Sequence, residues 1–165
     1  DGQAQLDAGL DEAGHLGLAY DYAYEAALID LQDLHHNSRD GLHMASLAGA
    51  WMALVAGFGG LRDTHGDLSF DPQLPDGISR LCFTIRWRGL RLRVDVAATE
   101  ATYSLRDGED GSLTFQHGDE DVTVHVGTPV TRPIVRRTPK LDRPQQPPGR
   151  EPVRRSRRHD TTALT

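Results

Sequence analysis

The sequence predicts an α+β chain, in which helices come first, a small antiparallel β-sandwich follows, and an extended tail ends the chain. Three observations predict it. Apolar residues recur every three or four positions from Leu16 to Leu31, as on one face of a helix. Residues 80–96 instead alternate polar and apolar side chains, which is typical of half-buried strands. After Thr128, proline and arginine replace the residues that form cores.

Two helices are predicted before residue 62. The first has an apolar face made by Leu16, Ala19, Tyr20, Ala23 and Ala27, completed by Leu28 or Leu31. The alanines themselves also favour a helix. The second helix runs from about Leu42 to Phe58, after a polar loop at residues 33–39. It is apolar nearly all round, which indicates burial, and the glycines at 57, 59 and 60 indicate its end.

The β half begins with a predicted hairpin. Residues 80–88 and 90–96 alternate on either side of a turn at Arg88-Gly89, and the first strand carries Leu81, Phe83, Ile85 and Trp87 on one face. Further short strands are expected at residues 68–70, 101–105, 112–115 and 122–126, and glycine-containing turns separate the later ones. Several short strands with such turns predict an antiparallel sandwich.

Charge divides the chain in two. Residues 1–131 hold 21 Asp and Glu against eight Arg, whereas residues 132–165 hold ten Arg and Lys against three acidic residues. The basic, proline-rich end is expected to be disordered. The basic segment Arg154–Arg158 would bind an anionic surface or nucleic acid, or serve only as a solubilising end.

Composition also bears on the compartment. No run of about 18 apolar residues is present, so no transmembrane span is expected. The first residues lack the basic and apolar regions of a signal peptide. Cys82 stands alone in an apolar strand pattern, which predicts a buried core residue. A reducing cytoplasm is the expected compartment.

The start of the second helix carries His43 and Ser46, three positions apart and therefore on one face. The free N–H groups and positive dipole end of a first helical turn favour an anion. His43, Ser46 and the backbone between them could thus hold a phosphate or a carboxylate. The other interpretation is that Asp40 caps the helix, His43 is a surface residue, and Ser46 is small because another helix packs close. Spacing alone leaves both open.

Several motifs in one order resemble a known family. They are Asp30-Leu31-Gln32-Asp33, Asn37-Ser38-Arg39-Asp40-Gly41-Leu42-His43, Ser46-Leu47-Ala48-Gly49-Ala50-Trp51 and Gly57-Phe58-Gly59-Gly60. Together they resemble glycoside hydrolase family 65, which contains the maltose, trehalose and kojibiose phosphorylases and some related hydrolases. Residues 68–75 and 83–89 resemble the junction into that family's C-terminal β-domain.

The resemblance implies a C-terminal fragment. Residues 1–62 would be the closing helices of an (α/α)₆ catalytic barrel, residues 63–128 the small β-sandwich domain and residues 129–165 the disordered tail. The parent would be an enzyme that cleaves α-glucosidic disaccharides with inversion, by phosphorolysis or hydrolysis. Its general acid would lie upstream, so that this fragment contains no catalytic residue and is inactive alone. The resemblance leaves open whether the parent protein forms a homodimer.

In this resemblance His43 and Ser46, with the backbone near Ala45 and Gly49, bind the inorganic phosphate co-substrate. Phosphate attacks in place of an activated water and needs no general base, but it needs N–H donors and positive charge. The family's phosphorylases commonly carry Thr-Ser where this chain has Ala45-Ser46, so one hydroxyl is absent here. No metal and no organic cofactor is expected.

Other polar residues receive structural interpretations. Asp30, Asp33 and Asp40 are expected to cap helices or order the loop. His35 and His36 lack further ligands at metal-binding spacing, and His117 and His125 are expected at turn and strand surfaces.

The β half of the chain also leaves open a function other than catalysis. The hairpin carries four arginines, Arg86, Arg88, Arg91 and Arg93. A nucleic-acid site would need several aromatic residues for base stacking, and Trp87 is the single one among these arginines, so a solvated sheet face is predicted. The alternative to an enzyme is a noncatalytic β-sandwich interaction module with a basic tail.

Overall fold

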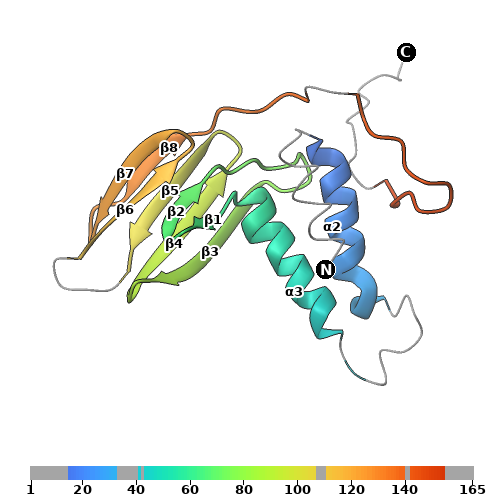
Figure 1. The fold of residues 1–165 in the computed structure, drawn as a ribbon, viewed down its shortest axis with the longest axis horizontal. Coiled ribbons are helices and arrows are strands. Elements are labelled where there is room, and N and C mark those ends of the chain that lie inside the picture. The colour runs from blue at the N-terminus through green and yellow to red at the C-terminus, as the bar shows by residue number, and fades with distance from the viewer. Residues whose placement is uncertain (1–14, 33–40, 42, 107–110, 140–141, 155–165) are drawn as a thin grey trace, which may run out of the picture. The chain divides into compact units, whose positions relative to one another are not determined.

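The computed structural model describes residues 15–32, 41, 43–106, 111–139 and 142–154, which fall into two compact units. The helical unit takes residues 1–53, 75–77 and 138–165, and the β-unit takes residues 54–74 and 78–137. Figure 1 shows the helices and strands of each. The predicted domain borders at residues 62 and 128 stay predictions about the parent protein.

Two helices form the described part of the helical unit, α2 (Leu16–Leu31) and α3 (Met44–Met52), and they contact each other. The predicted face of α2 is confirmed in part: Leu16, Ala19 and Ala23 are buried, whereas the later part of the face is half-buried. Leu18 and Asp21, which lie outside the predicted face, are buried as well. Two packed helices are therefore present, as the three- and four-residue spacing predicts. No helix among the described residues is long and apolar enough to cross a membrane.

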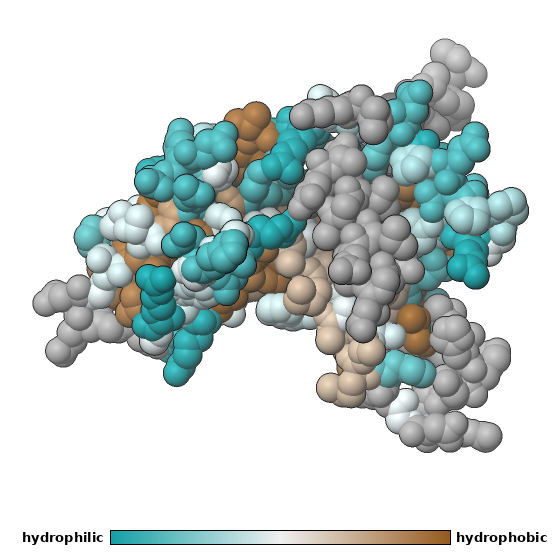
Figure 2. Space-filling model, viewed as in Figure 1, coloured by the Kyte–Doolittle hydropathy of each residue, from teal (hydrophilic) through white to brown (hydrophobic). Residues whose placement is uncertain are grey.

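The predicted burial of the second helix is wrong for α3, whereas Ala53, Val55 and Phe58, at the end of the predicted span, are buried. No residue of α3 is buried, and the side chains of Met44 and Trp51 are 72% and 51% exposed. Figure 2 shows pale-brown, apolar surface over this helix. A helix that is apolar all round needs neighbours on several sides, and α2 supplies one of them. After Met52 the chain continues as a π-helix over Ala53–Phe58.

The described residues of the β-unit form eight strands in two four-stranded sheets. They are β1 (Arg62–Thr64), β2 (Asp67–Phe70), β3 (Arg80–Trp87), β4 (Leu90–Ala97), β5 (Glu100–Leu105), β6 (Ser112–His117), β7 (Glu120–His125) and β8 (Val130–Pro133). One sheet has the order β1-β2-β6-β7 and the other β3-β4-β5-β8. Neighbours are antiparallel except for the parallel pair β2 and β6. The predicted sandwich is thereby confirmed in the main.

Aromatic rings from both sheets fill the core between them. Phe70 of β2 lies 5.3 Å from the ring centres of both Tyr103 of β5 and Phe115 of β6, and the last two rings are 4.7 Å apart. These separations lie in the favourable range for tilted aromatic pairs. Val94 and Val122 are also fully buried. The core is thus built from every second residue along each strand, as the two-residue period of a β-strand predicts.

Strand β3 lies at the edge of its sheet and shows one correction. Leu81, Phe83, Ile85 and Trp87 share the inner face as predicted, and they are half-buried because an edge strand has a neighbour on one side only. Cys82 is exposed, so the prediction of a buried cysteine is wrong. The alternation that turns its neighbours inward turns Cys82 outward.

The stretch after residue 129 also differs from the predicted disordered tail. Val130–Pro133 form β8, which pairs with β5. Beyond it, the Gln73 side chain donates to the carbonyl oxygen of Val135 at 2.8 Å and accepts from the backbone N–H of Arg137 at 3.1 Å. Gln73 is 2% exposed. A buried amide therefore supplies the hydrogen bonds that a further strand would supply.

Residues 146–150 of the remaining tail are hydrogen-bonded to the helix α2. The Tyr22 hydroxyl on α2 donates to Gln146 and to the carbonyl oxygen of Arg150. Disorder of the rest of the tail stays a prediction.

The first testable prediction concerns Asp95 on β4. Arg80 Nε donates to Asp95 Oδ1 at 2.7 Å, and this hydrogen bond holds the pKa of the Asp95 carboxyl below its usual range. A carboxyl with a lowered folded pKa stabilises the protein above its unfolded pKa of about 3.9, and loses that stabilisation as pH falls through the folded pKa. At pH 7, Asp95→Asn should lower the free energy of unfolding by at most about 1 kcal/mol.

Denaturant unfolding of wild type and Asp95→Asn between pH 2.5 and 7 checks this. The difference between the two proteins should shrink as the pH falls. Asp121→Asn, at an exposed position of β7, is the matched control. A difference that is constant over the whole pH range would contradict the assignment of the effect to the carboxylate charge.

Candidate anion site at the start of α3

His43 is the N-cap residue of α3, one position earlier than the first-turn place predicted for it. Its backbone has φ −78° and ψ 87°, and its carbonyl oxygen accepts from the N–H groups of Ser46 at 2.9 Å and Leu47 at 3.1 Å. Its side chain makes no capping hydrogen bond and is half-buried, as is Ser46. The His43 ring is thus not used to cap the helix.

Gly41 sets the chain direction into this helix. Its φ is +128°, a conformation that side chains with a Cβ rarely adopt. A Cβ at this position would meet no atom within 4 Å, so the backbone angle and not space requires glycine. Sequence reasoning missed this role, because a lone glycine in a polar loop gives no signal of its φ.

The start of α3 offers several donors in one turn. The N–H groups of Met44 and Ala45 come before Ser46, whose N–H is the first to be bonded within the helix, so the helix itself cannot satisfy them. His43 and Ser46, three positions apart, add an imidazole and a hydroxyl on the same side. Positive helix-end charge and N–H donors together suit a tetrahedral anion such as phosphate. The structure thus brings the two predicted site residues together at one helix end.

The other sequence candidates fall in two groups. Asp33, Asp40, His35 and His36, and the side chain of Asp30, lie outside the described residues. His125 ends β7 and is exposed, as predicted. Among the described residues, no three His, Cys, Asp or Glu side chains are grouped so that they could hold a metal ion.

His117 is a correction, because it is buried rather than at a surface. It is 9% exposed, and its Nε2 lies 3.0 Å from the carbonyl oxygen of Pro133. A carbonyl oxygen only accepts, so Nε2 carries the proton and Nδ1 accepts from the Tyr103 hydroxyl at 2.7 Å. Burial raises the pKa of Tyr103, which keeps its hydroxyl protonated. His117 of one sheet therefore links two strands of the other.

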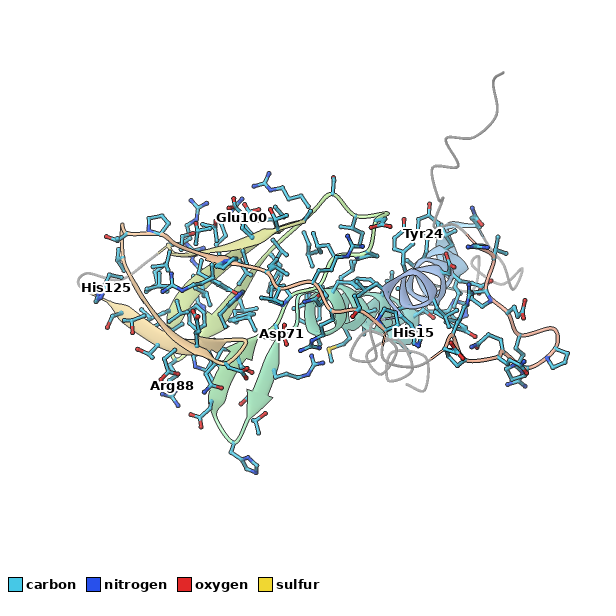
Figure 3. The ribbon with its side chains drawn as sticks, turned by 90° about the horizontal axis from the view of Figure 1, so that it is seen from above. His15, Tyr24, Asp71, Arg88, Glu100 and His125 are labelled. Carbon is cyan, nitrogen blue, oxygen red and sulfur yellow. The ribbon has the colours of Figure 1, made fainter. Side chains whose placement is uncertain are left out.

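The β-unit has a cleft of about 430 Å³ beside this histidine, with both polar and apolar lining residues. It lies between the β6–β7 turn and residues 133–137, and Asp71, which is labelled in Figure 3, forms part of its wall. Its charged groups are largely paired: Asp71 with Arg137, and Glu120 with Arg132 at 3.7 Å. Because both nitrogens of His117 are also engaged, the cleft presents few groups ready for a ligand. The helix end is the stronger candidate site.

Comparisons with known proteins place these helices and the small two-sheet domain in one family. Residues 5–52 match the family model described as the glycosyl hydrolase family 65 central catalytic domain. Residues 61–124 match the model of the family 65 C-terminal domain. The chain belongs to glycosyl hydrolase family 65, and the resemblance in the sequence is thereby confirmed.

Individual relatives agree with this. An uncharacterized glycosyl hydrolase from Mycobacterium tuberculosis is 65% identical over 87% of this chain and 18% of its own length. An alpha,alpha-trehalose phosphorylase from Thermoanaerobacter brockii is 38% identical over 60% of this chain and 13% of its own length. The solved structure of a protein titled kojibiose phosphorylase, from the human microbiome, has a TM-score of 0.71 at 22% identity, over 79% of this chain and 18% of that one. That likeness supports the fold. The chain spans about a fifth of its relatives' length.

Proposed function

We propose that the protein to which this chain belongs cleaves an α-linked glucose disaccharide by inverting phosphorolysis, and that His43 and Ser46 bind the attacking phosphate. The observation that carries the proposal is the cradle at the start of α3, where an imidazole, a hydroxyl and two backbone N–H groups share one turn. Relatives named trehalose and kojibiose phosphorylase support the substrate class.

In the proposed reaction, a phosphate oxygen attacks the anomeric carbon from the face opposite the glycosidic bond. The bond from that carbon to the leaving oxygen breaks, and a carboxylic acid donates its proton to this oxygen. The acid belongs to a segment before this chain. The role of this chain's residues is to hold the phosphate. The backbone N–H groups of Met44 and Ala45 and the His43 ring stabilise its charge by hydrogen bonding, and the Ser46 hydroxyl adds one hydrogen bond.

The exposed surface of α3 supports a barrel around it. Met44, Leu47 and Trp51 expose large apolar side chains, at 72%, 41% and 51%, and a contiguous exposed apolar surface of this kind marks a site of contact. Since the chain spans about a fifth of its relatives' length, the neighbouring helices of an (α/α)₆ barrel are the expected contacts. On this proposal the fragment alone is inactive, because it lacks the acid and the sugar site.

The second testable prediction is made for the longer protein. His43→Ala should raise the phosphate KM about ten- to a hundredfold, the loss of one charge-assisted contact worth about 1.5–3 kcal/mol. Ser46→Ala should have a smaller effect, because a neutral hydroxyl bond is worth about 1 kcal/mol. The disaccharide KM should stay near its wild-type value in both variants. The measurement is the initial rate of phosphorolysis against phosphate concentration, at saturating disaccharide.

His125→Ala removes an exposed histidine from the β-unit and is the matched control, with circular dichroism as the check of folding. If His43→Ala leaves the phosphate dependence unchanged, His43 is not a phosphate contact. If the wild type releases free glucose without needing phosphate, the enzyme is a hydrolase, and the cradle assignment fails while the family membership stands.

A further inference from the structure

We propose that the cleft of the β-unit, between the β6–β7 turn and residues 133–137, binds a neutral saccharide, namely a glucosyl unit of the substrate or product. All residues that line the cleft belong to the β-unit, so the site shares none with the phosphate cradle at the start of α3. The chemistry of the cleft selects a neutral polyhydroxyl ligand, and only the choice of an α-linked glucose sugar rests on the proposed function.

The cleft has the size and shape of a small-molecule site. Its volume of about 430 Å³ lies in the lower part of the range of roughly 300–1,000 Å³ that such sites occupy. One wall is the turn at Gly118 and Asp119, and the other includes the segment 133–135 that continues from β8. Gly118 has φ +57°, which glycine adopts readily at a two-residue hairpin turn.

Both walls are held in place by side chains that are themselves buried. His117 lies at the base of the turn, and its Nε2 donates to the carbonyl oxygen of Pro133 at 3.0 Å. On the other wall, the Gln73 side chain bonds to the backbone of Val135 at 2.8 Å and of Arg137 at 3.1 Å. A site that is already formed loses little conformational entropy when a ligand binds. The cleft is therefore prepared for an occupant.

The polar groups of the cleft suit hydroxyl groups, which both donate and accept hydrogen bonds. Asp71 and Arg137 form an ion pair in the wall, with side chains 42% and 40% exposed. A guanidinium has more N–H donors, and a carboxylate more acceptor positions, than one ion pair uses. Asp119 adds a second carboxylate, and no described residue forms a hydrogen bond or ion pair with its side chain. Neighbouring sugar hydroxyls can thus bond to the donor and the acceptors together.

The charges of the cleft argue against other classes of small ligand. Carboxylates outnumber the guanidinium among the lining residues, which disfavours phosphate and other anions. A cation also gains little, because Glu120 is bridged by Arg132 at 3.7 Å and Asp119 is exposed to water, which screens an ion pair. In the described part of the chain, no group of His, Cys, Asp and Glu side chains can hold a metal ion. A neutral ligand that uses donors and acceptors together fits best.

The apolar part of the lining suits the C–H groups of a sugar ring. Pro72, Pro133, Ile134 and Val135 line the cleft beside its polar groups. A sugar presents C–H groups as well as hydroxyls, so a lining that is partly apolar and partly polar matches it. No Phe, Tyr or Trp is among the described residues that line the cleft, so the expected affinity is weak, with a Kd of about 1 mM.

The third testable prediction is protection of the cleft by sugar in the longer protein. With trehalose, maltose or glucose at about 10 mM, the backbone amides of residues 118–120 and 134–137 should exchange hydrogen at least about threefold more slowly. The reason is that a ligand stabilises the closed state that binds it. Hydrogen exchange read by mass spectrometry locates the protection, and so separates the cleft from a sugar site in the catalytic domain.

A matched pair of variants tests the cleft residues. Asp119→Ala with Arg137→Gln removes an acceptor and donors from the cleft, and should raise the Kd for the sugar at least about tenfold. Asp121→Ala with Arg136→Gln makes the same charge changes at positions outside the cleft lining, and should stay within about twofold of wild type. Asp119→Ala alone, at an exposed turn, repeats the test without disturbing the ion pair. Circular dichroism checks folding of all variants.

The proposed function and the cleft can fail separately. Binding in the cleft needs no phosphate, so the protection of residues 118–120 should appear without phosphate and also in His43→Ala. A loss of phosphate dependence in His43→Ala with the protection retained would support both proposals, whereas protection without any phosphorolysis would leave only the cleft site.

Four outcomes would overturn the proposal of a saccharide site. Absence of protection in these segments with all three sugars would mean that the cleft does not bind saccharides. Equal protection by glycerol at the same mass concentration would show a general cosolvent effect. Equal loss of protection in the cleft variants and the matched control would assign the effect to charge near the cleft. Protection by spermidine with none by the sugars would make the cleft a cation site.

Discussion

Gly60→Ala is expected to unfold or severely destabilise the β-unit, with a loss of at least about 3 kcal/mol in the free energy of unfolding. Two causes add. Gly60 has φ +64°, which costs a residue with a Cβ about 1–2 kcal/mol. A Cβ at Gly60 would also lie 2.2 Å from the backbone carbonyl of Asp71, and backbone cannot move aside as a flexible side chain can.

Gly60 lies close to the Asp71 backbone because two backbone hydrogen bonds join their segments. The carbonyl oxygen of Gly60 accepts from the N–H of Asp71 at 3.1 Å, and the carbonyl oxygen of Phe58 accepts from the N–H of Gln73 at 2.9 Å. These bonds tie the end of the π-helix to the segment after β2. Gly60 therefore joins the helix end to the strand, and a side chain there would force the two apart.

Gly118→Ala is the matched control for this prediction. Gly118 has φ +57°, and a Cβ there would meet no atom within 4 Å, so this variant measures the cost of the backbone angle alone. It should lose about 1 kcal/mol. Urea unfolding of both variants gives the comparison, and near-equal losses would contradict the assigned clash with Asp71.

The second large effect is expected at the buried pair Tyr103 and His117. Tyr103→Phe leaves His117 Nδ1 buried without its donor, and His117→Phe leaves the Tyr103 hydroxyl buried without its acceptor. Each single variant should lose about 2–3 kcal/mol, the cost of an unsatisfied buried polar group. His117→Phe should lose more, because it also removes the bond to the carbonyl oxygen of Pro133.

The double variant separates this hydrogen bond from general packing. When both partners are replaced by apolar rings, no polar side-chain atom of the pair is left unsatisfied. The combined loss should therefore be smaller than the sum of the single losses, with a coupling energy of about 1–2 kcal/mol. Chemical unfolding of the four proteins completes the cycle. Strict additivity would contradict a direct bond between the two side chains.

The helix face and the strand alternation were predicted correctly because each is a local property. The burial of Leu16, Ala19 and Ala23 follows from helical geometry. The inner face of β3, from Leu81 to Trp87, follows from the two-residue period. The start of α3 was predicted to within two residues, because His43, expected in the first turn, is the N-cap residue. The family was found from several motifs in one order, and the family models confirm it.

The errors arose where burial depends on distant parts of the chain. Cys82 was expected in the core although the alternation of β3 turns it outward, and His117 was expected at a turn although β6 continues to it. Cys82 is exposed because nothing in the described chain covers the outer face of β3. His117 is buried because Tyr103 and Pro133, from two strands of the other sheet, surround it.

The sequence by itself determined that helices precede a small β-sandwich, which residues form the inner face of β3, the family, and the candidate phosphate residues His43 and Ser46. The tertiary structure decided what those faces meet. It placed Gly60 against the Asp71 backbone and aligned Arg106 with Arg91, although neither pair is adjacent in sequence. The physical reason is that periodicity follows from local backbone geometry, whereas register and burial follow from which distant strands pair. The pairing of strands is a property of the whole fold.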